Sequence, residues 1–291
     1  MNVLNSALVS IGVLFWQLVL PFQPTESLPA VDVGQYVPVI QSEAEPTLAV
    51  GAKAALVEDA NTRAQLYAKN ADQSLPIASL TKLMTAYIIT RDKSPDDIVV
   101  IPDEVKTVQG GENATISLQA GDRVKMRDLL QAALIPSAND AAVALAVWHS
   151  GSVENFVTEM NRTAQQLKLD SSKFTNPTGL DPNGSQASAK DLALLTHFAL
   201  ASPLIEQYVS RASGGFRSET GRPYAFVSTN QLLSQKGVKG VKTGYTLSAG
   251  QCLITLTEID GRRVITVVLA SPDRFSESRS MINWGTGLDY E

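Results

Sequence analysis

Hydrophobic residues recur at helical spacing in the middle of the chain and in short, strand-like runs toward both ends. Downstream of Pro76, apolar residues at i, i+3, i+4, i+7 and i+8 predict one apolar stripe on a helix from Ser79 to about Thr90. The residues of this stripe are Leu80, Leu83, Met84, Tyr87 and Ile88. Further helices are expected over residues 126–134, 139–149, 153–167, 189–200, 203–209 and 274–284.

Strand patterns gather at the two ends of this helical region. Residues 54–57 and 64–67 predict a hairpin around the turn Asp59-Ala60-Asn61-Thr62, and the turn Asp260-Gly261 joins two longer runs. The remaining strand candidates are 98–101, 240–243, 251–258 and 262–270, with irregular β or turn structure at 116–118 and 121–124. This order predicts an α/β (α+β) fold, an antiparallel sheet built from both chain ends and flanked by helices, with an inserted all-helical lobe of about residues 103–210.

The N-terminal segment differs from the rest of the chain. The apolar run over residues 7–20, followed by Pro21, predicts a signal peptide or N-terminal membrane anchor over residues 1–22. No Lys or Arg precedes Lys53, so the usual basic start of such a segment is missing, and a buried core helix is the alternative. Residues 23–46 are interpreted as a linker, and residues 47–291 as the main domain.

Charge and residue counts narrow the classes of function. A net charge of −5 over 291 residues argues against a nucleic-acid partner. Cys252 is the single cysteine, so no internal disulfide can form. The two histidines, His149 and His197, have no Cys or carboxylate at ligand spacing, so neither zinc nor another cofactor is expected. A serine triad that depends on histidine is poorly supported.

Ser79 and Lys82 are the first candidates for chemistry. Three residues apart at the start of a helix, their side chains share one face of the first turn. Free N–H groups and the helix dipole at this end suit a nucleophile whose reaction produces an oxyanion. A lysine flanked by apolar residues can lose its proton and act as a base. Alone, the pair also fits an ordinary helix start with a surface lysine.

Two further motifs follow in order, and the set of three carries the argument. Ser137-Ala138-Asn139 lies in the break between two helices, where it could equally be a helix cap. Lys242-Thr243-Gly244 lies on a strand candidate near the other end of the chain. With Ser79-Leu80-Thr81-Lys82 they form the S-x-x-K, S-x-N and K-T-G set of penicillin-binding proteins and class A β-lactamases.

Through these motifs, residues 48–285 resemble the serine D-alanyl-D-alanine carboxypeptidases, the low-molecular-mass penicillin-binding proteins with a DD-peptidase/β-lactamase-like fold. The stretch Asn176-Pro177-Thr178-Gly179-Leu180 resembles the carboxypeptidases in particular. After Asn139 we find no Glu-x-x-Leu-Asn motif, which in β-lactamases positions the deacylating water. The resemblance implies that any anchoring falls to the N-terminal segment.

The resemblance also implies a role for each motif residue. Ser79 would attack the D-Ala-D-Ala carbonyl and Lys82 would take its proton, while Ser137 would pass a proton to the leaving D-alanine. Asn139 would hold the substrate amide. The terminal carboxylate would lie near Lys242-Thr243-Gly244.

Two more residues receive a role by the same resemblance. The N–H groups of Ser79 and Tyr245 would form an oxyanion hole. Arg274, ten residues before Trp284, would bind the carboxylate, although a solvated arginine at a helix start is the simpler interpretation.

The implied partners are peptidoglycan stem peptides and, as covalent inhibitors, β-lactam antibiotics. We therefore expect an extracytoplasmic protein, secreted or N-terminally anchored and so possibly membrane-associated. A D,D-endopeptidase that cuts peptidoglycan cross-links would use the same residues. A β-lactamase and a non-catalytic penicillin-binding protein are the remaining alternatives.

Overall fold

The computed structural model describes residues 48–108, 114–180 and 184–287. The predicted signal peptide or anchor over residues 1–22 and the predicted linker over residues 23–46 lie outside the described residues. No helix in these three described ranges combines the length and the hydrophobicity needed to cross a bilayer.

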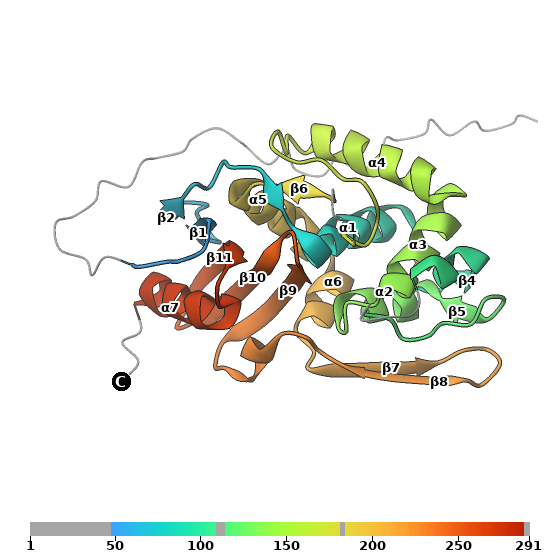
Figure 1. Cartoon of the computed structure of the whole chain (residues 1–291). Coiled ribbons are helices and arrows are strands. Elements are labelled where there is room, and N and C mark those ends of the chain that lie inside the picture. Colours follow the sequence, from blue (N-terminus) through green and yellow to red (C-terminus); the bar gives the residue numbers. More distant parts are fainter. Residues whose placement is uncertain (1–47, 109–113, 181–183, 288–291) are drawn as a thin grey trace, which may run out of the picture. The chain divides into compact units, whose positions relative to one another are not determined.

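A five-stranded antiparallel sheet forms the centre of the fold, in the strand order β2-β1-β11-β10-β9 (Figure 1). Its strands are β1 (Ala54–Asp59), β2 (Gln65–Lys69), β9 (Val238–Thr246), β10 (Gly250–Ile259) and β11 (Arg262–Ser271). Because β1 pairs with β11, the first strands of the described chain join its last ones. This confirms the predicted sheet built from both ends of the chain.

The helices lie close to where the periodicity places them. They are α1 (Lys82–Asp92), α2 (Met126–Leu134), α3 (Asn139–Ser150), α4 (Val153–Gln166), α5 (Ala189–Leu200), α6 (Pro203–Val209) and α7 (Arg274–Thr286). A short 3₁₀ turn, η1 (Ala78–Thr81), leads into α1, so the α-helix itself begins at Lys82. Ser79 therefore lies on the entry turn of the predicted helix.

Helix α1 is buried on more sides than its sequence pattern predicts. The predicted stripe is buried or half-buried, but Lys82, Thr85 and Ile89, which lie outside the stripe, are buried as well. Helices α2, α3, α4, α5 and α6 all pack against α1, so it lies at the centre of the helical region (Figure 1). This position removes the amine of Lys82 from bulk water.

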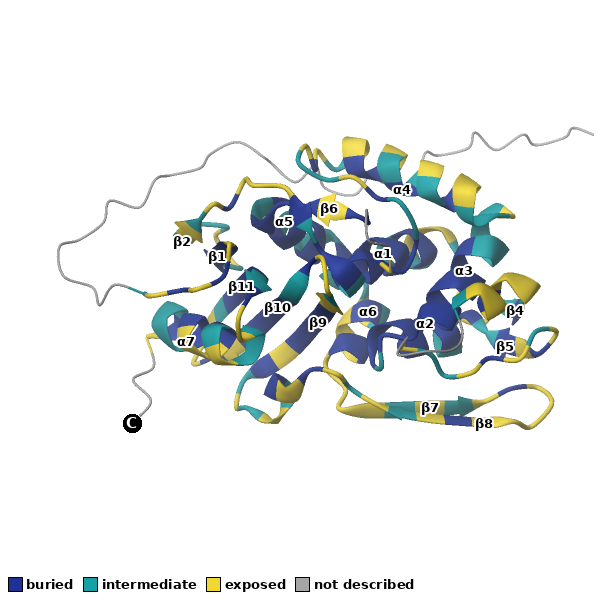
Figure 2. Ribbon diagram, in the orientation of Figure 1, coloured by how far each residue is buried: buried dark blue, intermediate teal, exposed yellow. Residues whose placement is uncertain are grey.

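Both faces of the sheet are covered, and β10 and β11 are accordingly buried without interruption over residues 252–257 and 264–269 (Figure 2). Leu56 and Ile254 belong to the core shared with α1 and α5. Val57 and Leu253, the neighbouring residues on the same strands, belong to a second core with Met281 of α7. The alternation of side chains along each strand thus joins two cores through one sheet.

Shorter pairs complete the described fold. They are β3 (Leu75–Pro76) with β6 (Gln186–Ala187), β4 (Ile98–Val100) with β5 (Arg123–Lys125), and β7 (Ser213–Arg217) with β8 (Pro223–Val227). Two further 3₁₀ turns are η2 (Asp103–Val108) and η3 (Gln231–Ser234). The β7–β8 hairpin has no clear sequence signal, because Gly214 and Gly215 interrupt the apolar pattern of β7.

Candidate active site

Ser79 and Lys82 form the centre of the site. Ser79 is half-buried on η1, and Lys82 is the first residue of α1 and fully buried. The Nζ atom of Lys82 lies 2.8 Å from the Oγ atom of Ser79, within hydrogen-bond distance. The predicted pairing of these two side chains on one face of the first turn is therefore found in the structure.

Lys82 has two further partners, and all its described acceptors are uncharged. Its Nζ donates to Asn139 Oδ1 over 2.7 Å and to the main-chain oxygen of Thr178 over 2.9 Å. A neutral amine has two N–H donors and one lone pair. It can therefore donate to Asn139 and Thr178 while its lone pair accepts the proton of Ser79.

The surroundings of Lys82 favour this neutral form. Burial is the main cause that lowers the pKa of Lys82 well below its usual 10.5, and the positive charge of Lys242 lowers it further. The carboxylate of Asp140 acts in the opposite direction and raises this pKa. Sequence analysis had assigned no role to Asp140.

The loop between α2 and α3 carries Ser137 and places Asn139 beside Lys82. Ser137 has a φ of 65°, a left-handed conformation that is unusual for a residue with a Cβ atom. Its Oγ atom is buried and has no hydrogen-bond partner among the described residues. A buried hydroxyl in this position is free to exchange a proton with a bound molecule. No described hydrogen bond joins Ser137 to Lys82 or Ser79.

Strand β9 approaches the site from the other side. At Gly244, an added Cβ atom would lie 3.2 Å from the Ser79 amide nitrogen and 2.9 Å from the Ile77 oxygen. A side chain in this position would push β9 away from η1, so glycine allows the close approach. Thr243 is buried one residue earlier, whereas Tyr245 is 59% exposed one residue later.

Two cations lie at this side of the site. Burial, and then the nearby charge of Arg274, lower the pKa of Lys242 to about 7. The Nζ of Lys242 donates to the Thr243 oxygen over 3.0 Å, and Nη1 of Arg274 donates to the Gly244 oxygen over 2.7 Å. Arg274 Nε is buried and has no partner within the described ranges. Both charges are thus directed to main-chain oxygens, which leaves them able to attract an anion.

The structure adds residues that sequence analysis did not assign to the site. Thr178 supplies the main-chain oxygen that accepts from Lys82, and Thr229 Oγ1 lies 2.5 Å from Thr243 Oγ1. Thr178 belongs to the stretch Asn176-Pro177-Thr178-Gly179-Leu180 that resembles the carboxypeptidases, but the resemblance gave it no role. An added Cβ atom at Gly179 would lie 1.8 Å from the Ala78 oxygen, so this loop presses directly on the Ser79 turn. Thr229 lies in no such stretch.

The histidines lie elsewhere in the fold. His149 Nε2 is 3.0 Å from Asp92 Oδ2, and His197 Nε2 is 2.6 Å from Glu58 Oε1. Neither has a described hydrogen bond to Ser79. These contacts tie helices α3 and α5 to neighbouring elements of the fold.

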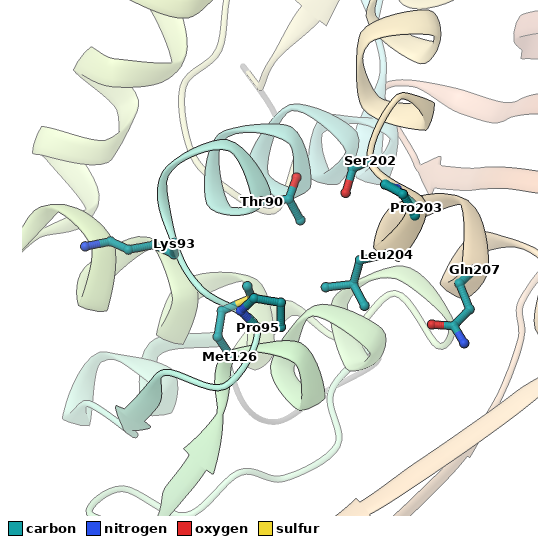
Figure 3. A pocket seen from close by; sticks show the side chains of 8 residues that line it. All are labelled: Thr90, Lys93, Pro95, Met126, Ser202, Pro203, Leu204 and Gln207. Atoms are coloured by element: carbon teal, nitrogen blue, oxygen red, sulfur yellow. The ribbon is translucent and has the colours of Figure 1, made fainter. Parts of the chain in front are cut away.

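A cavity of about 620 Å³ lies near the other end of α1, away from this site (Figure 3). It is lined by Thr90, Lys93, Pro95, Met126, Ser202, Pro203, Leu204 and Gln207, none of which is a candidate site residue (Figure 3). A smaller cavity of about 420 Å³ is bordered by Pro136, the residue before Ser137, and by strand β8. Neither of these two cavities is lined by a candidate site residue.

The chain is similar to known proteins in both sequence and structure. A family model described as D-alanyl-D-alanine carboxypeptidase matches residues 40–273. The D-alanyl-D-alanine carboxypeptidase DacF of Bacillus subtilis is 35% identical over 230 residues, which cover 77% of this chain and 58% of the Bacillus protein. The D-alanyl-D-alanine endopeptidase of Pseudomonas aeruginosa is 35% identical over 219 residues, which cover 74% of this chain and 70% of that protein.

Solved structures share the same architecture. The Streptomyces K15 DD-transpeptidase matches with a TM-score of 0.79 and 28% identity, over 84% of this chain and 100% of the other. Penicillin-binding protein D2 of Listeria monocytogenes, solved in its ampicillin-bound form, matches with a TM-score of 0.70 and 31% identity, over 83% and 100% of the two chains. The described fold is thus that of these proteins, whereas the chain spans less than two thirds of the Bacillus relative.

Proposed function

Because this chain belongs to the D-alanyl-D-alanine carboxypeptidase family, we propose that it is a serine-type D-Ala-D-Ala carboxypeptidase acting on peptidoglycan stem pentapeptides. The observation that carries this proposal is the 2.8 Å contact between Lys82 Nζ and Ser79 Oγ. A fully buried amine with a lowered pKa, in contact with a hydroxyl, is the arrangement of a base and its nucleophile.

The proposed reaction begins with proton transfer from the Ser79 hydroxyl to the neutral amine of Lys82. The Ser79 oxygen then attacks the carbonyl carbon of the D-Ala-D-Ala bond, and the N–H groups of Ser79 and Tyr245 stabilise the oxyanion. The tetrahedral intermediate collapses as the C–N bond breaks, and the proton held by Lys82 passes through the Ser137 hydroxyl to the departing D-alanine, which restores the neutral amine of Lys82. Water then cleaves the acyl-enzyme ester and releases the shortened peptide.

Substrate binding involves the remaining candidates. Asn139 holds the amide of the peptide while its own Oδ1 keeps Lys82 in place. Lys242, Thr243 and Gly244 bind the end of the substrate, and Arg274 attracts its terminal carboxylate. The hydrogen bond from Arg274 to the Gly244 oxygen supports this role, because it places a cation in contact with the strand that carries the motif.

D,D-endopeptidase activity is the second candidate. It is favoured by the Pseudomonas relative, which is named as an endopeptidase. The match covers 70% of the length of that protein, compared with 58% of the length of the Bacillus carboxypeptidase. Incubation with a stem pentapeptide and, separately, with a cross-linked peptide dimer separates the two activities. Release of D-alanine from the pentapeptide without monomers from the dimer supports the carboxypeptidase, whereas monomers without D-alanine would replace it by the endopeptidase.

The same site is proposed to react with β-lactams, which mimic the D-Ala-D-Ala end. The ampicillin-bound form of the Listeria protein supports this part of the proposal. We place the protein outside the cytoplasm, where peptidoglycan lies, secreted or held at the membrane through residues 1–22. We propose no β-lactamase activity, because the water-positioning motif is not found after Asn139.

A further inference from the structure

Thr229 lies between the two sides of the candidate site. Its main-chain N–H donates to the oxygen of Ile135, two residues before Ser137, over 3.3 Å. Its side-chain oxygen lies 2.5 Å from that of Thr243 on β9. Thr229 therefore contacts both the loop that carries Ser137 and the strand that carries Lys242.

The neighbours of Thr229 fix its position. The N–H of Ser228 donates to the oxygen of Ala212 over 2.8 Å, and the N–H of Asn230 donates to Ser228 Oγ over 3.1 Å. Asn230 Oδ1 in turn accepts from Leu232 at the start of η3 over 3.0 Å. Thr229 itself is exposed, so its hydroxyl is presented to solvent by a backbone that is held on either side.

The hydroxyls of Thr229 and Thr243 can both act as donors, but they differ in their exposure to solvent. Thr243 is buried and Thr229 is exposed, so a molecule that reaches the Thr243 hydroxyl also meets that of Thr229. Each hydroxyl has one proton, and in the pair one of them donates to the other. A carboxylate can accept hydrogen bonds at both of its oxygens, so a bound carboxylate can accept one hydrogen bond from each of the two hydroxyls.

The charges around this pair favour an anion. Lys242 and Arg274 donate to the main-chain oxygens of Thr243 and Gly244, and neither cation forms a salt bridge within the described ranges. Positive charge therefore lies beside the main chain of Thr243 and Gly244. The cations attract an anion to this end of the site, while the paired hydroxyls fix where its two oxygens lie.

We propose that Thr229 is a substrate-binding residue that, together with Thr243, clamps the terminal carboxylate of the peptide through two O–H donors. This inference rests on the proposed function and deepens it, because the clamp selects substrates with a free carboxylate over those whose end is blocked. Such a contact exists before and during the reaction, so its loss weakens binding and leaves the chemical step unchanged.

The test measures binding without turnover, in the full chain carrying Ser79→Ala. Calorimetry gives Kd for a diacetylated Lys-D-Ala-D-Ala peptide and for the same peptide with a C-terminal amide. Thr229→Val removes the hydroxyl at nearly constant shape, and Thr229→Ser keeps it. Thr255→Val is the matched control, since Thr255 Oγ1 forms a similar pair with Thr266 Oγ1 at 2.7 Å inside the sheet.

We expect Thr229→Val to weaken binding of the acid peptide by roughly tenfold, as for loss of one hydrogen bond to a charged group, and to leave the amide peptide unchanged. Thr229→Ser should restore the acid peptide, and Thr255→Val should change neither Kd. Equal losses on both peptides, no loss, or no binding of either peptide would overturn the clamp. Release of D-alanine by the unaltered chain is measured alongside: binding without release removes the proposed function and leaves the clamp standing.

Discussion

Lys82 Nζ lies 2.8 Å from Ser79 Oγ although the two residues belong to different elements, the helix α1 and the turn η1 before it. The contact depends on a turn whose residue Ala78 has a φ of 46° and against which Gly179 packs. A serine and a lysine with the same spacing on an exposed helix would have no reason to meet. The packing of three distant segments around Ser79 turns a common pattern into a reactive pair.

Lys82→Ala should nearly abolish acylation by a labelled penicillin. Loss of a general base costs roughly 100- to 10,000-fold in rate, while the apolar packing around α1 should keep the protein folded. Lys239→Ala is the control, because Lys239 is exposed on the same strand as Lys242. Acylation at the normal rate in a folded Lys82→Ala protein would remove the lysine from its proposed role.

Asp140→Asn should shift the pH profile of acylation. The carboxylate of Asp140 raises the pKa of Lys82, so its neutralisation lowers that pKa and moves the acidic limb of the profile toward lower pH. Asp140 also accepts from the amides of Leu118, over 2.9 Å, and Ile116. Stability should therefore fall by about 1–3 kcal/mol, as for a weakened buried acceptor. If stability falls while the acidic limb of the pH profile stays in place, Asp140 only stabilises the segment that contains Ile116 and Leu118 and does not influence Lys82.

The stability of the protein should rise with pH above neutrality because of Lys242. Its pKa is about 7 in the folded protein and near 10.5 in the unfolded chain, so between these values the unfolded chain binds more protons. The free energy of unfolding therefore increases with pH over this window. Urea denaturation at pH 7 and pH 10 should show a larger increase for the wild type than for Lys242→Met. If the free energy of unfolding rises equally in both proteins, the amine of Lys242 keeps its charge in the folded protein over this pH range, and the prediction is wrong.

Gly179→Ala should damage both stability and acylation. An added Cβ atom would lie 1.8 Å from the Ala78 oxygen, and φ is +77°, so the Ser79 turn must shift. Gly121→Ala is a matched control with a φ of +86° and no atom within 4 Å, and it should cost only about 1–2 kcal/mol of backbone strain. The comparison uses urea denaturation together with penicillin acylation. If both variants acylate at the wild-type rate, the loop does not position Ser79.

Much of this site could be predicted from sequence, because its side chains occur in short motifs on strongly periodic elements. The bounds of α2, α5 and α6 agree with their apolar patterns, and Lys82 and Asn139 are found in contact. The main-chain oxygen of Thr178 could not be predicted, since every residue carries one and only the fold selects it. The contact of Thr229 with Thr243 likewise depends on a hairpin that the sequence pattern does not mark.

The pattern also underestimated how deeply α1 is buried. An apolar stripe predicts one buried face, yet α1 is packed on several sides by the other helices. Hydrophobic periodicity describes the faces of a single helix and does not show how many other elements pack against it. The burial of Lys82, on which its chemistry depends, follows from this packing and required the structure.

The most direct test of the account maps a penicillin adduct by mass spectrometry after brief incubation of the full chain with benzylpenicillin. We expect the adduct on the peptide that contains Ser79, and no adduct in a folded Ser79→Ala variant. An adduct on another residue, an adduct that persists in Ser79→Ala, or none on the wild-type protein would contradict the claim that Ser79 is the nucleophile.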